Sequence, residues 1–108
     1  MAKYLFIAAY TAEGIRGLLA DGGSGRVDAA RTTCESVGGR LESMYYSFGE
    51  QDAYITCDLP DNTAAAAVSL AVAATGALDT RTVVLLTPDE IDEATRTAVS
   101  FRAPGAKP

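Results

Sequence analysis

Hydrophobic and polar residues alternate in the segments 3–10, 40–48, 53–59 and 80–86, and this alternation predicts β-strands. Between them, apolar residues recur three or four positions apart in 12–37, which is the spacing of an amphipathic helix. A second helix is predicted over 61–76, an alanine-rich segment that Asp61 can cap and Gly76 can close. The order β-α-β-β-α-β is typical of the ferredoxin-like arrangement. The sequence therefore predicts an α+β protein.

Capping signals place the helix boundaries. Thr11 and Asp61 can each accept a hydrogen bond from an unpaired amide at a helix start. Thr87, Pro88 and Glu90 form a capping box with proline at the first helical position, which predicts an extra C-terminal helix. The glycines in 21–25 should break or kink the first helix. We expect a single domain over 1–102 and a disordered tail over 103–108.

One face of the predicted sheet is left without a helix. If Leu5, Ile7, Leu41, Ile55 and Val84 face the helices, the other face carries large and mostly aromatic side chains. A monomer rarely exposes so large an apolar patch, so we expect a second copy to stack on it, sheet to sheet, as a closed barrel. The candidate interface residues are Tyr4, Phe6, Tyr10, Met44, Tyr46, Phe48 and Tyr54.

Composition narrows the chemistry. The chain has 108 residues, a formal net charge of −5 and no histidine. The acidic balance disfavours nucleic acid and anionic membrane surfaces. Without histidine, the chain cannot form a histidine-held zinc or haem site or a Ser-His or Cys-His nucleophile pair. We expect no metal and no cofactor, and a cytoplasmic location because no signal peptide is visible.

Several segments resemble the GYD domain family, small bacterial and archaeal proteins of the dimeric α+β barrel superfamily. The matching positions are Tyr4, Thr11, 14–16, 28–31, 38–41, Tyr45, Gly49, 59–61 and 81–82. The resemblance covers about Lys3 to Glu90 and implies the ferredoxin-like fold and self-association. The sequence differs from the family motif at Gln51, where the motif has a tyrosine before the aspartate of the hairpin loop. The resemblance implies little about activity.

The main candidate ligand site contains Tyr45 with Ser43, Ser47 and Arg81. On the predicted register, Tyr45 points between sheet and helices, where a phenol, hydroxyls and a guanidinium could hold a small aromatic or acidic molecule. The alternative is that Tyr45 is a core residue with a satisfied hydroxyl and Arg81 a solvated strand end.

Asp52 and Thr11 are further candidates. Asp52, in the loop between the second and third strands, could act as a base if burial raised its pKa, or could simply bond its own turn. Thr11 lies at the start of the first helix. Cys34 and Cys57 both fall on core-facing positions, so we expect neighbouring, buried and inert thiols.

Two functions from different classes fit these observations. One is a homo-oligomeric binding or assembly protein that holds a small hydrophobic molecule between sheet and helices. The alternative is a cofactor-independent enzyme, monooxygenase-like or isomerase-like, that acts on a small aromatic or acidic molecule. The lack of histidine favours the binding protein.

Overall fold

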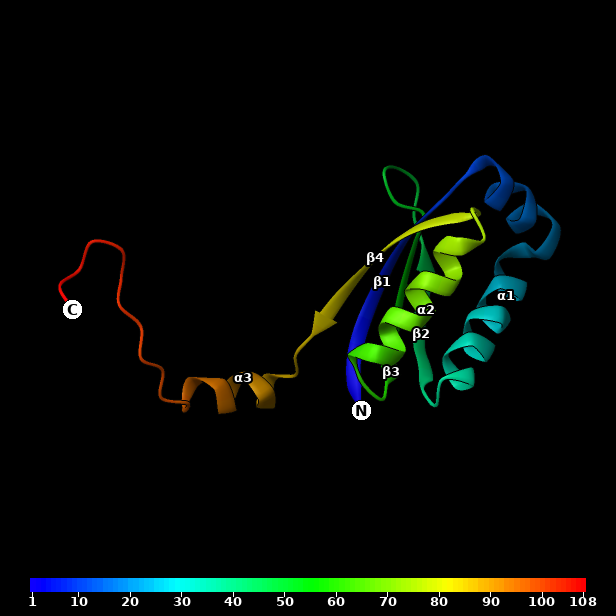
Figure 1. Ribbon diagram of the computed structural model, residues 1–108. Coiled ribbons are helices and arrows are strands. Elements are labelled where there is room, and N and C mark those ends of the chain that lie inside the picture. The colour runs from blue at the N-terminus through cyan, green and yellow to red at the C-terminus, as the bar shows by residue number, and fades with distance from the viewer.

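The computed structural model describes residues 1–108 and contains four strands and three helices (Figure 1). In chain order these are β1 (Ala2–Tyr10), α1 (Ala12–Ser36), β2 (Arg40–Tyr46), β3 (Ala53–Leu59), α2 (Asn62–Ala74), β4 (Leu78–Leu85) and α3 (Pro88–Thr95). The predicted element order, including the extra C-terminal helix, is confirmed. No helix of the chain has both the length and the apolar character that crossing a membrane requires.

The strands form one antiparallel sheet in the order β2-β3-β1-β4. β2 and β3 are joined by a hairpin, while α1 and α2 carry the chain across the sheet between β1 and β2 and between β3 and β4. Both helices cover the same face of the sheet (Figure 1). The other face, called the open face below, has no helix over it.

The helix boundaries follow the predicted caps. The hydroxyl of Thr11 accepts from the amide of Gly14, and the carboxylate of Asp61 accepts from the amide of Ala64. Thr87 makes the reciprocal capping box with Glu90 at the start of α3. The glycine-rich segment kinks α1 rather than ending it, at Gly22, which has a φ of 75°.

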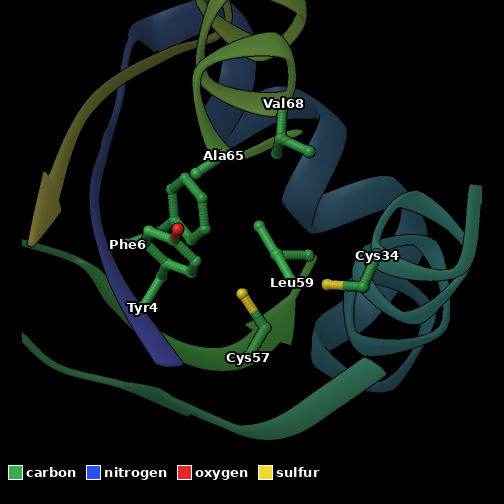
Figure 2. Close-up of a cluster of buried hydrophobic side chains, with 7 residues drawn as sticks. All are labelled: Tyr4, Phe6, Cys34, Cys57, Leu59, Ala65 and Val68. Carbon is green, nitrogen blue, oxygen red and sulfur yellow. The ribbon is translucent and has the colours of Figure 1, made fainter. Parts of the chain in front are cut away.

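The core lies between the sheet and the two helices that cover it. β1 contributes aromatic side chains to this core. Tyr4 is 1% exposed, and Phe6 is also buried. Figure 2 shows their rings beside Ala65 of α2, in a cluster whose members are Tyr4, Phe6, Cys34, Cys57, Leu59, Ala65 and Val68. The prediction that Tyr4 and Phe6 lie on the open face is therefore wrong.

The physical reason is that β1 is apolar on both faces, so alternation alone cannot choose between them. Leu5 and Ile7 lie on the open face instead, paired across the strands with Thr56 and Tyr54. The helix above Tyr4 is rich in alanine, and its short side chains leave room that large rings fill. The hydroxyl of Tyr4 also reaches Asn62 at the start of α2, at 2.6 Å.

A bulge changes the faces of β2. The register with β3 shifts between Leu41 and Ser43. Simple alternation would put Leu41 and Met44 on opposite faces, but because of the bulge both lie on the helix side. Leu41 packs against the core cluster, and Met44 lines a cavity beneath the helices. The hydroxyl of Tyr46 donates to the carbonyl of Gly23 in α1 at 3.0 Å.

The predicted interface set is thus largely redistributed. Tyr10, Met44 and Tyr46 lie on the helix side, and Phe48 projects from the hairpin loop. Only Tyr54 is on the open face as predicted, opposite Tyr45. The predicted helix-facing positions Leu41, Ile55 and Val84 do lie on the helix side, since Val84 pairs with Tyr4 and the other two pack on the core.

Candidate functional site

A cavity of about 100 Å³ lies between the sheet and the two covering helices. It is lined by 14 residues, 10 of them hydrophobic. They are Phe6, Ala8, Tyr10, Arg26, Ala30, Thr33, Cys34, Met44, Ile55, Val68, Ser69, Val72, Leu78 and Thr80. Every strand and both covering helices contribute to this wall, so the complete fold is needed to form it.

Small side chains explain why the space stays open. Ala8 on β1 and Ala30 on α1 both line the cavity, and each offers only one side-chain carbon. Larger neighbours, Phe6 from the same strand and Val68 from α2, bound the cavity and belong to the core cluster. The cavity is therefore a gap in the packing beside the core.

The polar groups of the cavity are few and mostly committed to bonds within the chain. Thr33 donates to the carbonyl of Ala29 at 2.9 Å, and the hydroxyls of Ser69 and Thr80 lie 3.3 Å apart. Arg26 is the one charged residue in the lining, and its guanidinium lies 3.5 Å from the carboxylate of Asp21. Such a lining suits an apolar molecule with a single polar or anionic end near Arg26.

Two cysteines lie together in the core, and one of them, Cys34, lines the cavity. Cys34 from α1 and Cys57 from β3 are both buried, and Figure 2 shows their side chains approaching between helix and sheet. The hydrogen bond from Cys57 to Cys34 and burial both raise the pKa of the Cys57 thiol, so it stays protonated at neutral pH. The same hydrogen bond lowers the pKa of the Cys34 thiol. The two thiols are thus buried neighbours, as predicted.

Tyr45 does not point into the cavity. It lies on the open face and is 72% exposed, so the prediction that it faces the helices is wrong. Arg81 shares its row across the sheet, but Tyr54 and Ile7 stand between them. Three strand spacings of about 4.8 Å put the two side chains roughly 14 Å apart, so they form no common ligand site.

Ser43, also on the open face, shares a hydrogen bond with Thr56 of the neighbouring strand. The bulge in β2 separates its face from that of Leu41, so Ser43 and Tyr45 stay together while Met44 turns toward the helices. Ser43, Tyr45 and Arg81 of the predicted cluster therefore all lie on the open face, on the opposite side of the sheet from the cavity.

Asp52 and Ser47, two other predicted site residues, come together at the hairpin loop. The carboxylate of Asp52 accepts from the amide of Tyr10 at 2.8 Å, and its own carbonyl accepts from the amide of Ser47 at 2.8 Å. Both residues border a shallow hollow between the hairpin loop and the first half of α1, together with Phe48. The Asp52 carboxylate thus ties the hairpin loop to the end of β1 rather than bonding its own turn, which is the role considered in the sequence analysis.

Thr11 has a structural position as well. Its hydroxyl donates to the carbonyl of Gly76 at 2.9 Å, while its amide donates to the carbonyl of Ala77 at 3.0 Å. These bonds tie the start of α1 to the turn that precedes β4. Thr11 does not line the cavity between sheet and helices.

Charged residues gather at one end of the open face. The carboxylate of Asp58 accepts from Arg40 at 2.9 Å and from Lys3 at 3.0 Å, and Lys3 also pairs with Glu42. These contacts, that with Arg40 first, hold the pKa of Asp58 below its usual value. The pairs with Glu42 and Asp58 raise the pKa of Lys3. This network joins β1, β2 and β3.

The cavity residues that sequence reasoning missed as a site are chiefly Phe6, Arg26, Ser69 and Thr80. Arg26 follows the glycine-rich kink directly, and Ser69 interrupts an otherwise apolar run in α2. These two polar residues, on helices that cover the sheet, were the features of the sequence that could have indicated the cavity. Phe6 could not be found without the orientation of β1.

The fold and cavity together define an α+β protein of ferredoxin-like topology with a small apolar site under its helices. The model of the GYD domain family matches residues 4–95, and the chain belongs to this family. The resemblance noted in the sequence is thereby confirmed. Comparison with curated proteins and with solved structures found no match.

Proposed function

We propose that this protein is a homo-oligomeric binding protein that holds a small, mostly apolar molecule in the cavity between its sheet and its helices. The supporting observation is the cavity itself, about 100 Å³ in volume and lined mainly by apolar side chains. Native interiors contain few voids larger than a water molecule, so an apolar gap of this size in a small domain suits a ligand.

The volume limits the ligand. An apolar cavity of about 150 Å³ can hold benzene, so this one accepts a molecule or an alkyl tail somewhat smaller than an aromatic ring. Arg26 lies in the lining and is only loosely paired with Asp21 at 3.5 Å. A carboxylate or another anionic group of a ligand would bind the Arg26 guanidinium, so the favoured ligand is a short-chain apolar acid.

Self-association is supported by the open face. Leu5 and Ile7 lie on its inner strand β1, with Val83 on the edge strand β4 to one side and Tyr54 and Tyr45 to the other, and no helix covers them. Stacking this face on a second copy would remove the exposed apolar area from water, at roughly 25 cal/mol per Å². The interface proposed here differs from the predicted set in every residue except Tyr54.

Catalysis by a cofactor-independent enzyme is the weaker proposal. Tyr45 and Arg81, the residues expected to act on a substrate, lie on the opposite side of the sheet from the cavity. The hydroxyl groups that line the cavity, those of Thr33, Ser69 and Thr80, bond to one another or to backbone. This arrangement supports retention of a ligand rather than its conversion.

The test is a titration with a short-chain carboxylic acid, followed by amide chemical shifts. We expect the shifts to change around Phe6, Arg26 and Ser69. Ala30→Leu would fill the cavity from α1 and should weaken binding at least tenfold, whereas Ala67→Leu, on the exposed side of α2, should leave it unchanged.

Circular dichroism would confirm that both variants fold. Unchanged affinity in the cavity-filling variant, or shifts confined to the open face, would refute the proposed site.

A further inference from the structure

The C-terminal arm, residues 87–108, leaves the body of the protein and extends away from it (Figure 1). The longest dimension of the chain is 61 Å and its radius of gyration is 17.6 Å, against about 13 Å for a compact domain of 100 residues. No residue of α3 is buried. Beyond α3, Val99 and Phe101 are 78% and 79% exposed. The arm thus carries large apolar side chains with no covering in its own chain.

The helix in the arm needs a packing partner. α3 has eight residues, whereas isolated helices shorter than about 12–15 residues are marginal in water. Its capping box and N-terminal proline favour initiation but contribute only about 1 kcal/mol each. Ile91 is exposed in the middle of α3. Burial of Ile91 against another surface would supply the missing stabilisation.

The area of the open face is small for a dimer interface. Four strands about 4.8 Å apart, with paired segments of roughly seven residues at about 3.3 Å each, cover on the order of 450 Å². A stable interface of standard size buries about 800 Å² on each partner. The sheet face is therefore too small to hold two copies together without further contacts.

The arm starts where the open face ends. Leu85, the last residue of β4, pairs with Lys3 at the end of β1 that carries the charge network. The arm therefore begins at the edge of the open face, next to any molecule stacked on that face. A surface formed by face and arm would be continuous and could be shared reciprocally by two identical copies.

We propose that the arm is a dimerisation arm: it packs Ile91, Val99 and Phe101 against a second copy of this chain stacked on the open face. Each copy then contributes a sheet face and an arm, and together these reach the area that a stable dimer needs. This inference rests on the self-association in the proposed function. It adds the segment that completes the interface.

The test uses the full chain with Ile91→Asp and Phe101→Asp combined. Sedimentation equilibrium should show the dimer dissociation constant rising at least tenfold relative to the unchanged protein. Leu70→Asp is the control, because Leu70 is apolar and exposed but lies on α2, on the side of the sheet away from the open face, and this variant should dimerise as tightly as the unchanged protein. Equal midpoints of urea unfolding measured at high dilution would show that both variants keep the fold.

Hydrogen exchange of the α3 amides supplies a second readout. We expect these amides to exchange slowly at concentrations where the protein is dimeric and rapidly when it is diluted to monomer. An unchanged protein that stays monomeric at millimolar concentration would overturn both the arm and the proposed self-association.

Another pair of variants distinguishes stacking of the open face from the contribution of the arm. Val83→Asp changes the open face at β4 and leaves residues 87–108 unaltered. If Val83→Asp breaks the dimer while the arm variant dimerises normally with unprotected α3 amides, the stacked face stands and the arm inference is overturned.

Discussion

Replacing Gly14 by alanine should destabilise the protein, although the same change usually strengthens a helix. Gly14 is buried in the first turn of α1, and a Cβ there would lie 2.0 Å from the carbonyl oxygen of Ala77 and 3.0 Å from the ring of Tyr10. Reaching an ordinary contact distance of about 3.5 Å requires the Ala77 carbonyl to retreat by roughly 1.5 Å. That carbonyl accepts from the amide of Thr11 at 3.0 Å, so the movement also breaks this bond.

The magnitude follows from these contacts. Overpacking costs about 1–3 kcal/mol, and the lost hydrogen bond adds about 0.5–1.5 kcal/mol. The helix propensity gained on replacing glycine is at most about 1 kcal/mol. We therefore expect Gly14→Ala to lower the free energy of unfolding by about 1–4 kcal/mol. Because Tyr10 lines the cavity, the same variant should also weaken ligand binding.

Gly17→Ala is the matched control. Gly17 lies one turn further along α1, is exposed, and has nothing within 4 Å of the position its Cβ would take. It should raise the free energy of unfolding by about 0.5–1 kcal/mol. Urea denaturation followed by circular dichroism at 222 nm measures both variants. If the two changes shift stability in the same direction, the close approach of α1 to the turn before β4 is wrong.

Three further predictions concern the core and the charge network. Leu59→Ala, at a position that is fully buried, should cost about 2–5 kcal/mol of unfolding free energy in urea, and a loss below 1 kcal/mol would contradict its place in the core. Asp58 has a lowered pKa in the folded protein, so its contribution to stability is present above its unfolded pKa of about 3.9 and is lost as the pH falls through the folded value. Asp58→Asn should therefore flatten the stability profile below about pH 4, and an unchanged acid limb would count against the pairing. Lys3 has a raised pKa, so its contribution is present below about pH 10.4 and is lost as the pH rises through the folded value. Lys3→Met should reduce the alkaline loss of stability measured by thermal melts, and an identical alkaline limb would argue against this role.

Local chemistry made the order of elements predictable from the sequence. The Thr87 capping box, the Asp61 cap and the glycines near residue 22 each act over a few residues, and the structure places a boundary or a kink at each. The family resemblance rested on the same short segments. The prediction of an α+β protein with ferredoxin-like topology needed nothing beyond these local signals and the strand alternation.

The faces of the sheet could not be predicted in the same way. β1 carries Tyr4 and Phe6 on one side and Leu5 and Ile7 on the other, so its hydrophobicity is nearly equal on both. The bulge after Leu41 depends on pairing with β3 and has no local signature. Both are tertiary effects.

The candidate site was predicted from the assignment of residues to the two faces of the sheet. Because that assignment was wrong for β1 and β2, the predicted site was wrong as well. Tyr45 moved to the open side with β2, and the cavity residues on β1 were assigned to the wrong layer. The thiol pair was predicted correctly because Cys34 and Cys57 face the core in either scheme of β1.

The charge network has a consequence for strand alignment. A strand that is apolar on both faces can slip by one residue without exposing many more apolar groups, so burial alone specifies the alignment of β1 only weakly. In the native alignment Lys3 stands directly opposite Asp58, and Asp58 stands opposite Arg40. A slip by one residue would turn Lys3 toward the helices and away from both carboxylates. The few charges at the end of the sheet therefore act with the Tyr4–Asn62 hydrogen bond to favour the alignment in which the rings of Tyr4 and Phe6 face the helices.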